Sequence, residues 1–232
     1  MIVCQLADRI RLITQPDHAH LARRIMERCV SLRDCLRADS ILLAIGEHDN
    51  GWEEEDASPA VDLETGRVVD FVGAPLAVRH RVWPRAIGRL SHDPWAAALV
   101  AQHALTVYER FRADAAWWAF FAELTALRDG MLDVSQGTPA DLALDYPFVR
   151  LGDLISLVFC AGWTEPQRFG GWVVEGAGRV VSVTPGPFAG PVPFEVEARE
   201  LLGATYRSDA DLAEAVSMSP KTILRGQVVS KG

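Results

Sequence analysis

One segment restricts the fold more than any other. Residues 141–160 form a predicted helix that is apolar on nearly all sides, and a helix of that kind is buried. Within its stretch FVRLGDLISLVFC the only acid is Asp153. Leaving a buried carboxylate unpaired costs several kcal/mol, so Asp153 needs a cation, a set of hydrogen bonds or a proton. The rest of the chain must therefore enclose this helix and provide for its carboxylate.

Three further predicted helices carry polar residues on their apolar faces. Residues three, four and seven positions apart share one face of an α-helix, so the phase of each polar residue can be compared with the apolar stripe. The inward-facing polar residues are His18 on helix 17–30, His48 and Asp49 on helix 41–50, and His103 on helix 94–112.

These side chains, together with Asp153, can satisfy one another through a shared metal ion. Neutral imidazole and carboxylate oxygens suit Mn, Fe, Zn or, less well, Mg. Two other interpretations stay open. A single inward histidine is more often a hydrogen-bonded core residue than a ligand, and Asp153 could instead pair with an arginine such as Arg150.

Composition excludes several classes of protein. The 232-residue chain has 23 basic and 31 acidic residues, a net charge of -8, which argues against nucleic acid or an anionic membrane as a partner. Its apolar runs are shorter than the roughly 18 residues of a membrane span, and its first residues do not resemble a signal peptide. We therefore expect a cytoplasmic protein. Its oligomeric state cannot be predicted from these features.

The lysine and cysteine content argues against several kinds of catalytic and metal site. The only lysines are Lys221 and Lys231, which excludes a phosphate-loop lysine and argues against a Schiff-base lysine. The four cysteines are scattered and form no CxxC pair, so neither a zinc knuckle nor a disulfide scaffold is expected.

The ends of the chain have β character. Short strands are predicted at 2–6 and 10–14, and beyond Gly162 the chain is rich in Gly, Pro and Val, with strands at 179–184, 194–201 and 222–230. We therefore expect a mainly α fold, α+β overall. A helical bundle would carry a small antiparallel β-sheet formed by the N-terminal hairpin and the C-terminal tail. The predicted units are a helical metal-binding domain, 1–166, and a β-rich extension packed on it, 167–232.

The segments DHAHLA, LLAIGEHDNGW and RLGDLISLVFC resemble the His … His-Asp … Asp signature of the HD-domain superfamily of metal-dependent phosphohydrolases. His18 matches the first histidine, His48 and Asp49 match the central pair, and Asp153 matches the last aspartate. The resemblance covers roughly residues 15–165 and implies an HD-like helical bundle. TQPDH, EHDNGW and the β-rich tail are also similar to a bacterial branch of that superfamily. The residues after the central pair, Asn50-Gly51-Trp52, depart from the usual small-apolar-Gly pattern.

The resemblance implies hydrolysis of a small phosphorylated substrate, with a metal-activated water attacking phosphorus. His103 is then the expected fifth neighbour of the metal. An acid between Glu47 and Asp56 would handle the proton, and arginines such as Arg79, Arg81 or Arg150 would hold the phosphate, with His92 as a further substrate contact. Two alternatives stay open. One is an HD-type di-iron oxygenase, which would need both His92 and His103 as ligands, and the other is a non-catalytic metal-binding sensor or interaction module.

Overall fold

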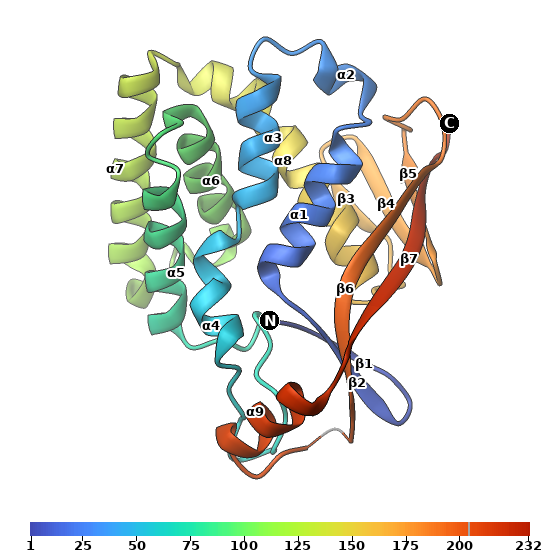
Figure 1. Ribbon diagram of the computed structural model, residues 1–232. Coiled ribbons are helices and arrows are strands. Elements are labelled where there is room, and N and C mark those ends of the chain that lie inside the picture. The colour runs from blue at the N-terminus through green and yellow to red at the C-terminus, as the bar shows by residue number, and fades with distance from the viewer. Residues whose placement is uncertain (204) are drawn as a thin grey trace.

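Figure 1 shows the protein as a computed structural model that describes residues 1–203 and 205–232. The α-helices are α1 (Gln15–Met26), α2 (Val30–Arg33), α3 (Ala38–Glu47), α4 (Glu53–Ala57), α5 (Leu76–Arg89), α6 (Pro94–Val107), α7 (Trp118–Ser135), α8 (Pro139–Cys160) and α9 (Asp209–Met218). Short 3-10 turns follow α3 (η1, Asn50–Trp52) and α6 (η2, Glu109–Phe111) and precede α7 (η3, Ala115–Trp117). The strands are β1 (Ile2–Gln5), β2 (Arg9–Ile13), β3 (Gln167–Phe169), β4 (Trp172–Ala177), β5 (Val180–Thr184), β6 (Val192–Leu202) and β7 (Lys221–Ser230).

Local sequence explains where the two helices that matter most for the site begin. Helix α1 starts after Thr14, whose hydroxyl accepts a hydrogen bond from the Asp17 amide, and a proline follows in the first turn. Helix α8 starts with a complete capping box between Thr138 and Asp141. Both starts orient helices that carry polar residues into the core.

The sheet overturns the predicted fold class. Its seven strands run in the order β1-β2-β6-β7-β5-β4-β3, and the central β5–β7 pair is parallel, with Val181 beside Val228. The long strands β6 and β7 curl along one side of the helices (Figure 1). The protein is therefore an α+β fold with a large mixed sheet, and the prediction of a mainly α bundle with a small antiparallel sheet was wrong.

Two properties of the sequence hid this sheet. Strands β3 and β4 lie in a glycine-rich stretch that includes Gly170, Gly171 and Gly176, and glycine weakens the strand signal. The alternation of apolar and polar residues along a strand also does not reveal the order of strands, because it indicates which face each side chain is on and not which strands pair. The connection from Pro185 to Pro191 carries the chain from β5 to β6, and β7 then lies between those two strands.

Helix α8 lies between the helices and the sheet. It packs against α1, α3 and α6 on one side and against β4 and β5 on the other. A Cβ on Gly152 would lie 2.9 Å from Met26 Cγ and 3.1 Å from Ile45 Cγ2, so this glycine permits the close approach of α1 and α3 to α8. The burial predicted for α8 is confirmed, and Asp153 is 2 % exposed.

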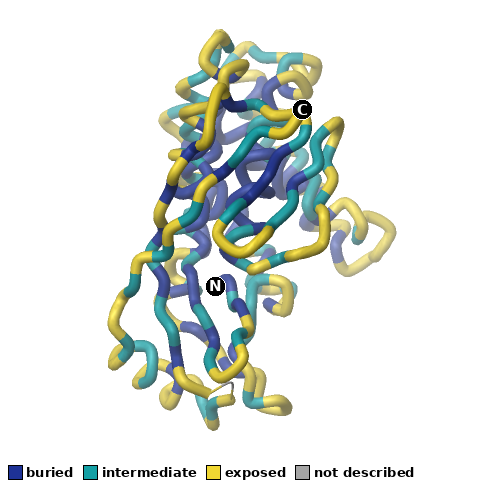
Figure 2. The backbone as a smooth tube through the Cα atoms, turned by 90° about the vertical axis from the view of Figure 1, so that its right-hand side faces the viewer, coloured by how far each residue is buried: buried dark blue, intermediate teal, exposed yellow. Residues whose placement is uncertain are grey.

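The outer side of the sheet is less buried than the interior. Figure 2 shows mostly intermediate and exposed positions along the strands that face the viewer. In β6 the buried residues alternate with exposed or half-buried ones, as its sequence predicts. None of the helices in the described ranges is long and apolar enough to cross a membrane. The boundary between a helical domain and a β-rich extension at residue 166 stays a prediction.

Candidate metal centre

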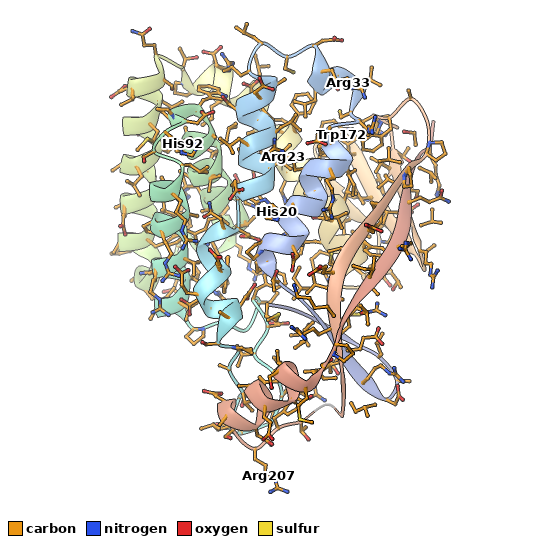
Figure 3. The ribbon with its side chains drawn as sticks, in the orientation of Figure 1. His20, Arg23, Arg33, His92, Trp172 and Arg207 are labelled. Carbon is orange, nitrogen blue, oxygen red and sulfur yellow. The ribbon has the colours of Figure 1, made fainter. Side chains whose placement is uncertain are left out.

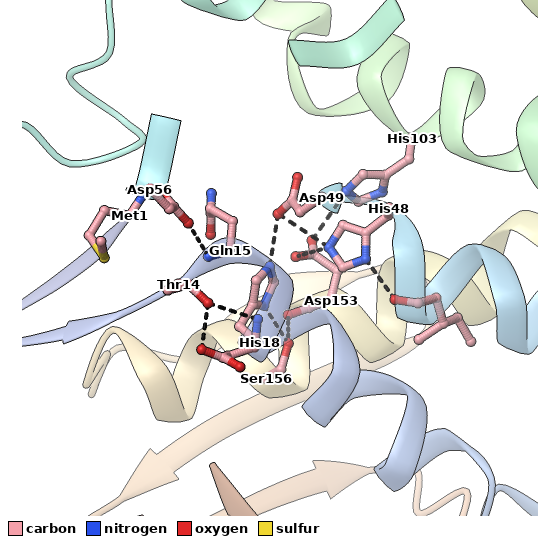
Figure 4. Close-up of polar contacts among 12 residues, drawn as sticks. Met1, Thr14, Gln15, His18, His48, Asp49, Asp56, His103, Asp153 and Ser156 are labelled. Atoms are coloured by element: carbon pink, nitrogen blue, oxygen red, sulfur yellow. Dashed lines mark hydrogen bonds and ion pairs between the residues drawn. The ribbon is translucent and has the colours of Figure 1, made fainter. Parts of the chain in front are cut away.

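The structure brings the five residues predicted as metal ligands into one buried cluster (Figure 4). His18 lies on α1, His103 on α6 and Asp153 on α8, while His48 and Asp49 lie just beyond the end of α3. The helix predicted over 41–50 ends earlier, at Glu47. His48 then caps α3, and Asp49 leads into the turn η1.

The hydrogen bonds of His18 fix its tautomer. The Ser156 hydroxyl donates to the Asp153 carbonyl oxygen at 2.9 Å, so it must accept at its Oγ from His18 Nδ1, 2.8 Å away. A neutral His18 ring would then present the lone pair of Nε2 to Asp49 Oδ2, 2.9 Å away. A lone pair facing a carboxylate oxygen is unfavourable unless a proton or a metal ion lies between them.

His48 has the same arrangement. Its Nδ1 donates to the Ile45 carbonyl oxygen at 2.8 Å, so Nε2 carries the lone pair of the neutral ring. That Nε2 lies 3.5 Å from both Asp49 Oδ2 and Asp153 Oδ1, and it is buried without a hydrogen-bond partner. Burial lowers the pKa of His48, but the two carboxylates outweigh burial and raise it to about 9. The cluster thus attracts a positive charge to this nitrogen.

The other side of the cluster contains His103, Asp153 and Arg150. His103 Nε2 lies 3.7 Å from Asp153 Oδ2, and burial lowers the pKa of His103 to about 3, so its ring is neutral. Arg150 pairs with the same carboxylate oxygen. Burial acts to raise the pKa of Asp153, but Arg150 and His48 hold that pKa below its usual value. Asp153 is therefore an anion.

The spacing of the candidate ligand atoms fits a divalent ion. Ligands about 2.1 Å from an ion lie about 3.0 Å apart in an octahedral arrangement and about 3.4 Å apart in a tetrahedral one. The separations of 2.9 and 3.5 Å around Asp49 Oδ2 lie close to these values. Two sets of three ligand atoms lie within 4.8 Å of one another, and both include His48: one adds His18 and Asp49, the other His103 and Asp153.

A pocket of about 150 Å³ lies beside the cluster. Asp49, His103 and Asp153 line one part of it, which makes the candidate metal centre accessible to a small molecule. Most of the remaining wall consists of aromatic side chains and three arginines, namely Trp52, Phe71, Trp83, Tyr108, Trp163, Arg79, Arg110 and Arg150. An anionic group next to a metal centre is the ligand that this combination suits.

The two acids predicted to handle the proton make other contacts. Asp56 is buried, and its carboxylate accepts from the Met1 amino group and from the Gln15 amide. Glu47 lies on the outer side of α3, where its carboxylate lies 3.6 Å from His20 Nε2 and accepts from the Asn50 amide. Neither Asp56 nor Glu47 lines the pocket.

Of the predicted substrate contacts, Arg79 and Arg150 line the pocket, and Arg81 and His92 do not. Arg81 forms a bidentate ion pair with Glu55 on the surface, with N–O distances of 3.0 and 2.9 Å. His92 is exposed in the turn before α6 (Figure 3), and it belongs neither to the pocket wall nor to the groups of candidate metal ligands among the described residues. The oxygenase interpretation needed His92 as a ligand, and the structure does not bring that residue to the centre.

Sequence reasoning missed several residues around the cluster. Ser156 fixes the tautomer of His18, and the Tyr146 hydroxyl lies 3.4 Å from His103 Nδ1. Trp52, Trp83 and Tyr108 were not singled out as pocket residues. Ser156 follows Asp153 by three positions on α8, so helical phase could have indicated that both face the same side.

Comparison with known proteins places the chain in a family without adding an activity. Neither the curated proteins nor the solved structures gave a match. Residues 1–202 match a family model described as "Protein of unknown function (DUF3891)". That match covers both the candidate metal centre and most of the sheet. The chain belongs to the DUF3891 family.

Proposed function

We propose that this protein is a metal-dependent phosphohydrolase of the HD type that acts on a small phosphorylated substrate. His18, His48, Asp49 and Asp153 would hold a divalent ion, with His103 as a further neighbour. One observation carries the proposal: the Nε2 atoms of His18 and His48 both face Asp49 Oδ2, at 2.9 and 3.5 Å, and His48 Nε2 is buried without a hydrogen-bond partner. A divalent ion placed among these atoms would satisfy all of them together.

Protonation of a histidine is the competing explanation. The 2.9 Å between His18 Nε2 and Asp49 Oδ2 is compatible with a protonated His18, whereas the distances at His48 argue against a proton there. A hydrogen bond between an imidazolium and a carboxylate is about 2.7–2.9 Å long. His48 Nε2 lies 3.5 Å from both carboxylates, outside that range for either one. A position between Nε2 and the two oxygens suits an ion larger than a proton.

A divalent ion bound there would polarise a phosphoryl oxygen and lower the pKa of a bound water. The chain itself supplies the remaining functions. Ser156 and the Ile45 carbonyl keep His18 and His48 in the tautomers that bind metal. Arg150 lies at the edge of the pocket, with its side chain 24 % exposed, and can bind a phosphoryl oxygen while it keeps Asp153 ionised.

The test compares two histidines on neighbouring segments. We expect the protein, purified without a histidine tag, to bind Mn²⁺ and to release phosphate from members of a phosphomonoester panel. His48→Ala should lose both properties. His20→Ala should keep both, because His20 lies on the outer side of α1 and contacts Glu47 (Figure 3). Equal metal content in the two variants would contradict the proposal, and bound metal without phosphate release would indicate a metal-binding module.

A further inference from the structure

Arg79, in the first turn of α5, is an unusual arginine. It is 9 % exposed, yet within residues 1–203 and 205–232 its guanidinium has no ion pair with a carboxylate. The neighbouring surface arginines differ, since Arg81 pairs with Glu55 and Arg85 pairs with Glu54. In a chain of net charge -8, acids are not scarce. A buried cation without an anion is costly, so its place needs an explanation.

The contacts of Arg79 leave part of the guanidinium unused. Its Nη2 donates to the Val72 carbonyl oxygen, and its Cζ lies 5.6 Å from the Tyr108 ring centre and 5.7 Å from that of Trp117. Its Nε is buried and has no hydrogen-bond partner. Trp52 Nε1, another N–H donor of the same pocket wall, also lacks one. Both N–H groups are covered by the pocket wall, so a ligand would meet the guanidinium through its other donors, and a guanidinium without an anion favours a ligand with acceptor oxygens.

The position of Arg79 relative to the metal centre defines the length of that ligand. Trp83 follows Arg79 by four residues on α5, and its ring centre lies 5.8 Å from that of His103. Residues four apart lie on one helix face, separated by about one turn, roughly 5.4 Å. Arg79 therefore lies about one helical turn beyond the residue that contacts the metal cluster, and it lines the same pocket.

We propose that Arg79 binds a second anionic group of the substrate, a carboxylate or a second phosphate. The phosphate to be hydrolysed would lie at the metal centre, so this inference rests on the proposed function. A pocket of about 150 Å³ leaves room for only a few atoms between the two groups. The substrate class is thus a compact phosphate ester with an anionic group at each end. A phosphate ester that lacks the second anionic group should bind more weakly.

The test measures binding and does not depend on turnover. The probes are 3-phosphonopropionate, which carries a phosphonate and a carboxylate, and propylphosphonate, which has the same length without the carboxylate; ethane-1,2-diphosphonate tests a second phosphorus group. Calorimetric titration of the full chain with Mn²⁺ present should show at least one of the probes with a second anionic group binding about tenfold or more tightly than propylphosphonate, because a hydrogen bond between arginine and an anion is charge-assisted. Equal affinities for all three probes would overturn the inference.

Variants assign the difference to one residue. Arg79→Gln should remove the preference for probes with a second anionic group while leaving the affinity for propylphosphonate unchanged. Arg79→Lys should retain part of the preference. Arg81→Gln, an exposed control on the same helix, should behave as the wild type. A preference that survives in a folded Arg79→Gln or is absent from a folded Arg79→Lys would contradict the assignment, with folding checked by circular dichroism.

The two proposals can fail separately. The same titrations on metal-free protein should retain the Arg79-dependent preference, because Arg79 does not contact the metal ligands. Propylphosphonate that binds equally well with and without Mn²⁺ would count against the metal-centred function alone. Loss of the preference with the metal dependence intact would count against the role of Arg79 alone.

Discussion

Two groups of charged residues lie close together in the sequence and have opposite environments. His48 and Asp49 are buried, with their polar atoms facing a shared point. A few residues later, α4 presents glutamates that pair with arginines of α5 on the surface; these pairs are Glu53–Arg89, Glu54–Arg85, Glu54–Arg89, Glu55–Arg81 and Glu55–Arg85. The surface pairs are satisfied within the chain.

The difference shows why density of charge is a poor guide to a site. Exposed ion pairs are worth about 0–1 kcal/mol each, so the surface group needs nothing further to be stable. A buried group of histidines and carboxylates is costly unless its charges and lone pairs are satisfied, and Arg150 satisfies only one oxygen of Asp153. Under the proposed function, the buried residues with unsatisfied polar atoms are the ones that would bind a ligand.

The largest expected effect comes from removing one carboxylate of the buried group. Asp153→Asn keeps the size of the side chain but loses the charge that faces His48 and His103. We expect Mn²⁺ affinity to fall by about 1000-fold or more, about 4 kcal/mol. Isothermal titration calorimetry measures the change. A Mn²⁺ affinity within about threefold of the wild-type value would show that Asp153 is not a ligand.

The tail tests whether stability and metal binding separate. Phe194 on β6 is 8 % exposed, and its ring centre lies 4.7 Å from that of Phe159 on α8. Phe194→Ala should lower the free energy of unfolding by about 3 kcal/mol, because it leaves a cavity. Chemical denaturation gives this value. Metal affinity of the folded variant should be unchanged, and loss of metal binding by a folded Phe194→Ala protein would make the tail part of the site.

A smaller effect is expected at Gly51, just after Asp49. A Cβ at this position would lie 2.0 Å from the Val82 carbonyl oxygen, so α5 must move away from η1. Gly51→Ala should cost about 1–3 kcal/mol of stability. Gly88→Ala is the matched control on α5, where a Cβ meets nothing within 4 Å, and it should be neutral or stabilising by up to about 1 kcal/mol. Similar melting temperatures for the two variants would refute the close approach.

The smallest effect belongs to the surface pairs. Glu54→Gln removes a carboxylate that is 51 % exposed and paired with Arg85 and Arg89. We expect the free energy of unfolding to change by no more than about 0.5 kcal/mol, with metal affinity unchanged. Parallel denaturation and Mn²⁺ titration would check both values. A loss of metal binding comparable to that of Asp153→Asn would show that the surface glutamates, and not only the buried cluster, are needed to bind the metal.

The position of each polar residue relative to the apolar stripe of its helix predicted from sequence that these residues lie together in the core. His18, His103 and Asp153 each lie on the apolar face of a helix, and such faces must converge on the core. Phase could not give the tautomers, because these depend on Ser156 and on the Ile45 carbonyl, which are tertiary or cap contacts. Phase does separate Arg79 from Arg81, because residues two apart lie on opposite faces of a helix, and only Arg79 is buried.

The sheet was harder to predict than the helices. Alternation in β6 was visible, but its partners were not: β2 pairs with it from the other end of the chain, and β7 pairs with both β6 and β5. Strand pairing depends on contacts between distant segments, which local patterns do not encode. The fold class was therefore misjudged even where single strands were predicted correctly.

The metal centre is tested most directly by a crystal of the wild-type protein grown with Mn²⁺ and measured at the manganese absorption edge. We expect an anomalous peak among His18 Nε2, His48 Nε2 and the carboxylates of Asp49 and Asp153, about 2.0–2.3 Å from the atoms that bind it. A peak only at the surface glutamates of α4, or no peak together with a proton-bridged His48, would show that the buried cluster is not a metal centre.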